Sequence, residues 1–129
     1  MVRLIEDSDL PMICRWHQAH TGRELPVNLL PPVGVLVIND GEPLGACWMY
    51  QAVGIGVAFI NTPVTYPGLR VGEALDIITA AVDALEAIAK EHDYGWLICN
   101  AQPAIARIMT RSMGFTPVEN ITQLARRIN

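Results

Sequence analysis

The sequence predicts one α/β (α+β) domain in which a mixed, mostly antiparallel sheet is flanked by helices. The chain has 129 residues, the usual length of a single domain, so we take residues 1–129 as one unit. Hydrophobic residues make up 51% of the chain and charged residues 17%, a composition that favours a buried core over disorder. Short β-type runs alternate with helical patterns, and this order is typical of strands and helices packed in layers.

The first third of the chain predicts a strand, a helix and a loop. Val2–Leu4 forms a short strand, and the acidic run Glu6–Asp9 caps a helix that has Pro11 in its first turn. The helix extends to about His20. Its inward-facing side chains are Met12, Ile13 and Trp16. Residues 21–32 contain a glycine and three prolines, so they form a shaped loop with room for a short helix.

The next segment contains the clearest hairpin. Val35–Ile38 and Leu44–Tyr50 are β-rich runs on either side of Asn39–Glu42, whose Asp-Gly pair is typical of a tight hairpin turn. Val53–Val64 predicts another strand or two. Two glycines near its start mark a turn, a bulge or a close backbone approach.

The last part of the chain predicts two helices and further strands. The first helix carries one apolar stripe: Ala74, Ile78, Ala81, Val82, Leu85, Ile88 and Ala89. Tyr94–Cys99 is a continuous apolar strand, and Pro103 begins a second amphipathic helix that Gly114 stops. Residues 116–118 and 121–124 predict one or two closing strands. The hairpin requires antiparallel pairing, whereas strand–helix–strand order over residues 57–99 allows a parallel pair, so the sheet is mixed.

Charge and cysteine content limit the function classes. Nine basic and thirteen acidic residues give a net charge of −4, which argues against nucleic acid or a membrane surface as a partner and favours small molecules or proteins. The apolar surplus is compatible with a homo-oligomer. Three widely spaced cysteines predict reduced thiols in the cytoplasm, and acids interrupt any apolar region of a secretory signal. The longest apolar run, Ala52–Ile60, is too short to span a bilayer.

Three strings carry a resemblance to a known family. They are the opening Val2–Pro11, the segment Val64–Leu75 (VTYPGLRVGEAL), and Ala106–Phe115 (ARIMTRSMGF). In this order the chain resembles the GNAT superfamily of acetyl-CoA-dependent N-acetyltransferases over nearly its whole length. The resemblance implies a GNAT-like acyltransferase fold, acetyl-CoA as co-substrate and direct transfer of the acetyl group to a primary amine.

The central string corresponds to the family's pyrophosphate-binding turn. A turn that leads into a helix N-terminus supplies backbone N–H donors and the positive end of the helix dipole. The matching Gly72-x-Ala74 is present, but Leu69 stands where the family has Arg or Gln, and Glu73 adds a carboxylate that could repel phosphate. The alternative is that the glycines only permit the turn and Glu73 only caps the helix. The implied cofactor-binding residues are Val64, Gly68, Leu69, Arg70, Val71, Gly72, Glu73, Ala74, Asn100 and Arg107.

The resemblance leaves the catalytic groups incomplete. Amine acetylation needs a base and an acid, which the family commonly supplies as a carboxylate near the fourth strand and a tyrosine in the last helix. Ala58–Pro63 contains no carboxylate, and Thr110 occupies the tyrosine position. Asn61 and Thr110 are therefore the candidate catalytic residues. Tyr66, Tyr94 and Cys99 are substitutes that we also interpret as packing residues.

Other groups of residues favour structural interpretations. Cys14, His17 and His20 recur every third residue on one helix, but no fourth ligand accompanies them, so no metal site is predicted. Trp96 is expected in the core. The aromatic pair Trp48 and Tyr50 shares one strand face and, with Arg23 and Glu24, could line an acceptor pocket in the resembled fold.

Two functions follow from the sequence. The first is an N-acetyltransferase that acts on a primary amine. The alternative is a GNAT-fold binding or structural protein, without catalysis and compatible with an oligomer. Leu69 and Glu73 depart from the family's phosphate turn, Pro103 stands where the family has an asparagine, with Asn100 three residues earlier, and Thr110 replaces the tyrosine.

Overall fold

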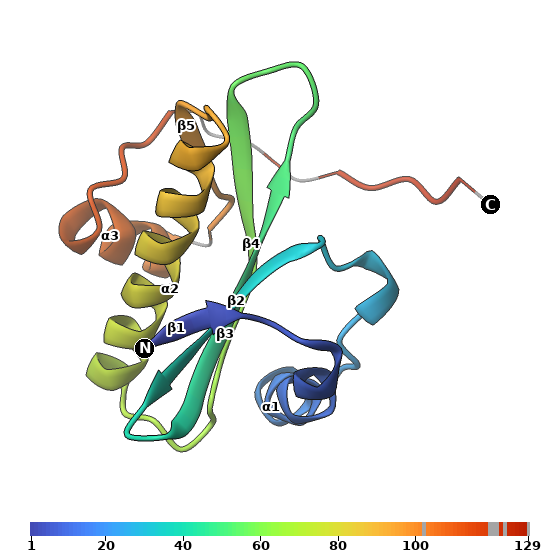
Figure 1. Ribbon diagram of the computed structural model, residues 1–129, viewed down its shortest axis with the longest axis vertical. Coiled ribbons are helices and arrows are strands. Elements are labelled where there is room, and N and C mark those ends of the chain that lie inside the picture. The colour runs from blue at the N-terminus through green and yellow to red at the C-terminus, as the bar shows by residue number, and fades with distance from the viewer. Residues whose placement is uncertain (102, 119–121, 123, 129) are drawn as a thin grey trace.

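The computed structural model describes residues 1–101, 103–118, 122 and 124–128, and these residues form a layered α/β structure (Figure 1). The sheet has the order β1-β2-β3-β4-β5. Its strands are β1 (Val2–Leu4), β2 (Val33–Asn39), β3 (Glu42–Gln51), β4 (Val57–Thr65) and β5 (Trp96–Ile98). The helices are α1 (Leu10–Thr21), α2 (Val71–Glu91) and α3 (Pro103–Ser112), and two short 3₁₀ turns, η1 (Asp7–Asp9) and η2 (Val27–Leu29), flank α1. The predicted mixed sheet is confirmed: every pairing is antiparallel except β4 with β5.

The two faces of the sheet are covered by different helices. Figure 1 shows α1 on one side of the sheet and α2 with α3 on the other. Because side chains alternate along a strand, β3 serves both sides: Cys47 and Met49 contact the α2 side, and Ala46 and Trp48 contact the α1 side. The predicted apolar stripe of α2 faces the sheet, with Leu85 fully buried. Two cores on opposite faces therefore hold the sheet in place.

The hairpin forms as its sequence predicts, and the first helix begins beside Pro11, but the acidic run before it forms the turn η1 and its side chains do not cap α1. Asp40 and Gly41 both have positive φ, 50° and 79°, the backbone that a two-residue Asp-Gly turn requires. At the other end of the sheet, η1 is fixed by Asp9, whose carboxylate accepts bonds of 2.8 and 2.9 Å from the Arg3 guanidinium and 2.8 Å from the Glu6 N–H. These bonds lower the pKa of Asp9, with the Arg3 hydrogen bond as the largest cause.

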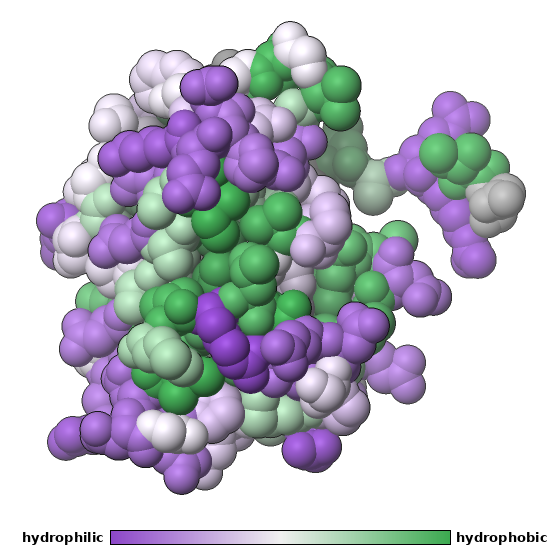
Figure 2. Space-filling view, viewed as in Figure 1, coloured by the Kyte–Doolittle hydropathy of each residue, from purple (hydrophilic) through white to green (hydrophobic). Residues whose placement is uncertain are grey.

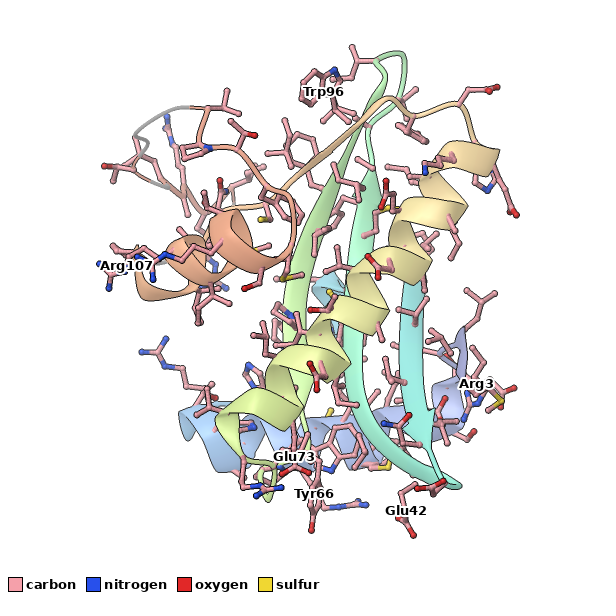
Figure 3. All side chains as sticks on the ribbon, turned by 90° about the vertical axis from the view of Figure 1, so that its left-hand side faces the viewer. Arg3, Glu42, Tyr66, Glu73, Trp96 and Arg107 are labelled. Atoms are coloured by element: carbon pink, nitrogen blue, oxygen red, sulfur yellow. The ribbon has the colours of Figure 1, made fainter. Side chains whose placement is uncertain are left out.

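The C-terminal part departs from the sequence prediction at three points. Trp96 was expected in the core, but it is 68% exposed. It is the first residue of β5 and pairs with Val57, and Figure 3 shows it at the end of the molecule opposite Glu73 and Tyr66. β5 is shorter than the predicted Tyr94–Cys99, because only three of its residues pair with β4.

The third departure concerns the predicted closing strands. Residues 116–118 are not in a strand, and these side chains are exposed instead of paired with the sheet. In the second expected strand, 121 and 123 lie outside the described residues, and Thr122 and Leu124 are not in a strand. Among the described residues, no helix has the length and apolar character needed to cross a membrane.

Candidate active site

A cleft opens where β4 and β5 separate. The two strands pair only from Val57 to Phe59 on β4 and from Trp96 to Ile98 on β5, after which β4 continues to Thr65 without β5 beside it. The cleft has a volume of about 350 Å³. Its lining residues come from β3, β4 and the segment after β5: Tyr50, Phe59, Ile60, Asn61, Cys99 and Asn100. Alternate backbone groups of β4 beyond Phe59 face this gap, so an extended ligand could bond to them as a strand would.

A bulge in β4 lies beside the cleft. Ala46 pairs with Val64 and Trp48 pairs with Asn61, so two steps along β3 match three along β4. Thr62 within this bulge has φ 52°, a left-handed conformation that is rare for a β-branched residue. Bulges bend a strand and re-aim its side chains, and they are common next to active sites. Here the bulge follows Asn61 directly and directs β4 away from the line of β5.

The other end of the unpaired part of β4 leads to the turn before α2. The Leu69 N–H donates to the Tyr66 carbonyl, and α2 then begins at Val71. The Ala74 N–H is used within the helix, since it donates to the Arg70 carbonyl. The N–H groups of Val71, Gly72 and Glu73 precede the first intrahelical bond, as at the start of any α-helix. Three donors therefore point out of one turn, at the positive end of a long helix.

Glu73 turns back toward the start of α2. Its Oε1 accepts bonds from the Arg70 backbone N–H (3.2 Å) and from Arg70 Nε (2.9 Å). The Arg70 guanidinium lowers the pKa of Glu73, with the backbone bond as the second cause, and Glu73 raises the pKa of Arg70. The carboxylate is therefore paired with a cation at the turn. This pairing reduces the repulsion that an isolated Glu73 would exert on a bound phosphate.

Gly72 occupies a position that the packing of the chain does not restrict to glycine. A Cβ built on it meets no atom within 4 Å, and its φ is not in the positive range. A glycine in a helix costs about 0.5–1 kcal/mol relative to alanine. A ligand that approaches the backbone closely would explain why this position is glycine. By contrast, a Cβ on Gly68 would meet the Tyr66 ring at 2.7 Å.

Comparison with solved structures places this geometry in a known fold. A Trypanosoma brucei acetyltransferase is similar over 98% of this chain and 99% of that chain, with a TM-score of 0.73 and 18% identity. The aminoglycoside N-acetyltransferase AAC(6')-Iy in complex with CoA is similar over 98% and 99%, with a TM-score of 0.71 and 14% identity. The aminoglycoside 6'-N-acetyltransferase AAC(6')-Ih from Acinetobacter baumannii gives 100% and 99%, a TM-score of 0.70 and 19% identity.

The chain has the GNAT fold. No protein-family model and no curated protein matches the sequence. The solved structures thus confirm, at the level of the fold, the resemblance seen in the three sequence strings.

Within the GNAT fold, the predicted cofactor residues occupy four places. The turn and the first turn of α2 hold residues 68–74, and Figure 3 shows Glu73 and Tyr66 together at this end of the molecule. Asn100 lies in the cleft. Arg107 is exposed on α3, well away from Glu73 in the same view. Val64 is buried in the α1-side core, so only its backbone can face a ligand in the gap.

Leu69 and the two candidate catalytic residues also occupy different environments. Leu69 packs against the α2-side core, which explains an apolar residue at this position of the turn. Asn61 lines the cleft, whereas Thr110 is exposed on α3 and is not part of the cleft lining. The structure thus brings Asn61 and Asn100 together and leaves Thr110 outside.

The proposed substitutes for the catalytic groups differ in their surroundings. Tyr94 donates its hydroxyl to the Ala52 carbonyl at 2.9 Å, a structural bond. Tyr66 makes an edge-to-face contact with Trp16, at a centroid distance of 6.2 Å. Cys99 does line the cleft, 3.7 Å from Met109 Sδ, and burial raises the pKa of its thiol. Cys99 is therefore protonated at neutral pH, which makes it a weak hydrogen-bond donor.

The histidines of α1 have structural contacts. His17 Nδ1 lies 3.0 Å from the Arg23 carbonyl oxygen, and His20 Nε2 lies 2.8 Å from that of Thr65, which links α1 to the end of β4. In the described part of the chain, no group of three His, Cys, Asp or Glu residues could hold a metal ion.

Sequence reasoning missed Phe59 and Ile60 as cleft residues. Their own sequence has no polar signal, and they reach the cleft because β5 ends opposite Phe59. The expected acceptor pair is also divided. Tyr50 lines this cleft, whereas Trp48 lines a separate pocket.

Proposed function

We propose that this chain transfers an acetyl group from acetyl-CoA to a primary amine of a small molecule. The observation that carries the proposal is the continuous path from the β4–β5 cleft, along the unpaired part of β4, to the three free N–H groups at the start of α2. Pantetheine has amides that suit the free edge of β4, and pyrophosphate suits a helix N-terminus. The acetyltransferase structures of the same fold, one in complex with CoA, support this assignment.

The pyrophosphate contacts are assigned to the turn. The N–H groups of Val71, Gly72 and Glu73 donate to phosphate oxygens, and the absence of a side chain at Gly72 allows close approach. Arg70 adds a positive charge, held at the turn by its 2.9 Å bond to Glu73. Its guanidinium suits a phosphate better than a lysine would.

The chemistry requires one bond to form and one to break. The neutral amine attacks the thioester carbonyl, the C–N bond forms, the C–S bond breaks, and the amine proton reaches the leaving thiolate by way of solvent. We assign Asn61 to hold the thioester carbonyl oxygen through its side-chain N–H, because it lines the cleft where β4 and β5 separate. Such a donor stabilises the developing oxyanion. Thr110, exposed on α3, stays a candidate for the last donor in this solvent path, and Thr110→Val, which removes its hydroxyl, is expected to slow the release of CoA thiol.

The assignment is tested by ligand binding. Acetyl-CoA raises the melting temperature of the wild-type chain by mass action, and Gly72→Trp removes this rise. Ala87→Trp, an exposed position on the same helix, is the matched control and keeps the rise. A wild-type protein that shows no shift at saturating ligand would contradict the proposal.

A second candidate is a GNAT-fold protein that binds CoA without transfer. It is favoured by the cleft lining, which contains no carboxylate, histidine or lysine among the described residues. Proximity alone accelerates aminolysis of a thioester, so the two candidates differ in a measurable way. Release of CoA thiol in a panel of amines supports transfer, whereas binding with no thiol release for any amine supports the second candidate.

A further inference from the structure

Cys47 is a buried thiol that lies opposite the bulge of β4. Its side chain is fully buried and packs in the core on the α2 side of the sheet. Ala46 pairs with Val64 and Trp48 pairs with Asn61, so Cys47 is the residue of β3 that the bulge leaves between two pairs. Figure 2 shows hydrophobic residues in the middle of one face of the molecule, framed by hydrophilic ones. The thiol thus lies in apolar packing beside an irregular part of β4.

The thiol donates to a backbone carbonyl at this irregular place. Cys47 Sγ lies 3.6 Å from the Asn61 carbonyl oxygen and 3.9 Å from that of Trp48, so the Asn61 oxygen is the nearer acceptor. Burial raises the pKa of the thiol to about 12, so the thiol keeps its proton at neutral pH and can donate it. The side chain of Cys47 therefore joins the core to the residue at which the bulge begins.

The peptide unit that accepts this bond also sets the conformation of Thr62. The Asn61 carbonyl and the Thr62 N–H belong to one rigid plane, so a rotation of the plane changes φ of Thr62. Thr62 has φ 52°, and a left-handed conformation at a β-branched residue persists only where its surroundings hold it. Pro63 follows and has no N–H to donate. The bond from Cys47 fixes the plane from the core side.

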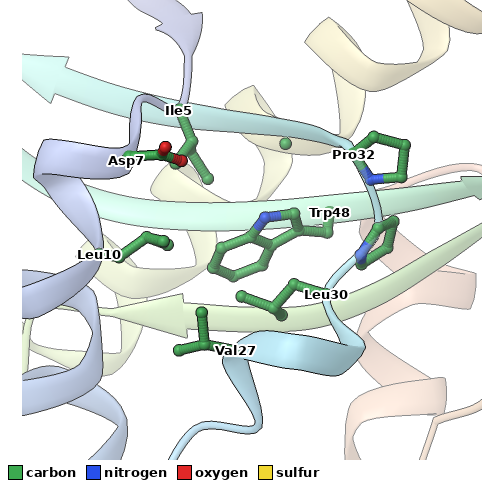
Figure 4. A pocket seen from close by; sticks show the side chains of 9 residues that line it. Ile5, Asp7, Leu10, Val27, Leu30, Pro32 and Trp48 are labelled. Atoms are coloured by element: carbon green, nitrogen blue, oxygen red, sulfur yellow. The ribbon is translucent and has the colours of Figure 1, made fainter.

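The side chain of Asn61 points away from Cys47. Asn61 pairs with Trp48, whose ring lies on the α1 side of the sheet, and Figure 4 shows this ring near Leu10 and Leu30. Cross-strand partners point to the same face of a sheet, so the Asn61 side chain also points away from the α2-side core. Cys47 does not line the cleft. Its effect on a ligand in the cleft must therefore pass through the backbone of Asn61.

We propose that Cys47 is a positioning residue for acetyl transfer. Its thiol bond to the Asn61 carbonyl fixes the bulge, and the bulge aims the Asn61 amide at the thioester in the cleft. This inference rests on the proposed function, because it uses Asn61 as the group that holds the thioester carbonyl. The thiol bond itself is a property of the ligand-free protein. Measurements without ligand therefore separate a failure of the bond from a failure of the transfer reaction.

Infrared spectroscopy of the S–H stretching band tests the bond. The chain has three cysteines, and the double variant Cys14→Ala with Cys99→Ala leaves Cys47 as the remaining thiol. A hydrogen bond lowers the S–H stretching frequency, so we expect the band of Cys47 below that of an unbonded thiol in an apolar solvent. A band at the frequency of the unbonded thiol would overturn the proposal.

The backbone of Thr62 supplies a second measurement on the ligand-free protein. The three-bond coupling between its N–H and Hα protons, measured by NMR, reports φ. Cys47→Ala removes the donor and is expected to change this coupling, whereas Cys47→Ser supplies a hydroxyl donor and retains it. Val37→Ala, a truncation at a buried position of the same core, is the matched control and leaves the coupling unchanged. An unchanged coupling in Cys47→Ala would overturn the proposal, because the rest of the fold would then hold the bulge.

The kinetics of thiol release test the link to Asn61. Cys47→Ala is expected to lower kcat about three- to tenfold with an unchanged KM for acetyl-CoA, as for the loss of one hydrogen bond. Cys47→Ser restores kcat, and Val37→Ala leaves kcat unchanged although it destabilises the chain. In an Asn61→Ala background, Cys47→Ala has no further effect, because it acts through Asn61.

Three kinetic results would count against this role. An equal loss of kcat from Cys47→Ala with and without Asn61, or a Cys47→Ser variant as slow as Cys47→Ala, would overturn the proposal. A wild-type chain that releases no thiol with any amine would overturn the proposed function and the role of Cys47 in transfer together. The infrared band and the Thr62 coupling would still show whether the thiol holds the bulge.

Discussion

Gly72 provides a prediction in which stability and ligand binding change in opposite directions. Replacement by alanine adds a Cβ that meets no atom within 4 Å, at a position with ordinary helical backbone. Glycine in a helix costs about 0.5–1 kcal/mol relative to alanine, so Gly72→Ala stabilises the ligand-free chain by that amount. For 129 residues at about 2.1 cal/mol/K per residue, the entropy of unfolding is about 0.27 kcal/mol/K. The melting temperature therefore rises by about 2–4 °C.

The same assay, repeated with acetyl-CoA, measures the ligand contribution. At a concentration 100 times the Kd, a ligand that binds only the folded state adds about 2.7 kcal/mol, which raises the melting temperature by about 10 °C. Gly72→Ala is expected to reduce this ligand-induced rise and Gly72→Trp to remove it, because each side chain fills space at the three N–H donors. If ligand-free Gly72→Ala melts at a lower temperature than ligand-free wild type, the packing of the chain requires a glycine here and the reasoning is refuted. An unchanged ligand-induced rise in Gly72→Trp would refute the phosphate assignment.

Three further predictions concern single side chains. Asp9→Asn removes the ion pair with Arg3 and lowers the free energy of unfolding at neutral pH by about 1–3 kcal/mol. Because folding lowers the pKa of Asp9, the ion pair stabilises the folded state fully above the ordinary aspartate pKa, and this stabilisation is lost as the pH falls through the lowered value. The free energies of unfolding of wild type and Asp9→Asn, measured by urea titration, therefore converge in acid. A difference that persists in acid would contradict this reasoning. Glu73→Gln removes a negative charge beside the phosphate donors and lowers the Kd for acetyl-CoA about two- to fivefold by calorimetry, whereas weaker binding would mean that Glu73 assists the ligand by holding Arg70. Asn61→Ala lowers kcat about ten- to a hundredfold with an unchanged KM for acetyl-CoA in a thiol-release assay. A raised KM with an unchanged kcat would instead assign Asn61 to binding.

The local structure of this chain could be predicted because its signals are short in range. The Asp-Gly turn, Pro11 in the first turn of α1, the apolar stripe of α2, and Gly114 after α3 each act through neighbours a few residues away. The turn at residues 68–74 was predicted for the same reason, since the glycines, Arg70 and Glu73 are adjacent in the sequence and contact each other in the structure.

The cleft and the pocket could not be predicted in full because they depend on where strands pair. Trp96 has the sequence surroundings of a core residue, but it is the first residue of a short strand at one end of the sheet and is exposed there. Phe59 and Ile60 enter the cleft because β5 stops pairing opposite Phe59. The separation of Trp48 from Tyr50 into two sites follows from the position of η2 over β3.

The sequence by itself determined the helices, the first five strands, the mixed sheet and the turn before α2, since periodicity and turn chemistry depend on adjacent residues. Only the tertiary structure decided which side chains meet across the sheet. It placed Asn61 with Asn100 and left Thr110 outside the cleft. The physical reason is that these contacts join residues far apart in the chain, and their positions depend on strand register and helix packing.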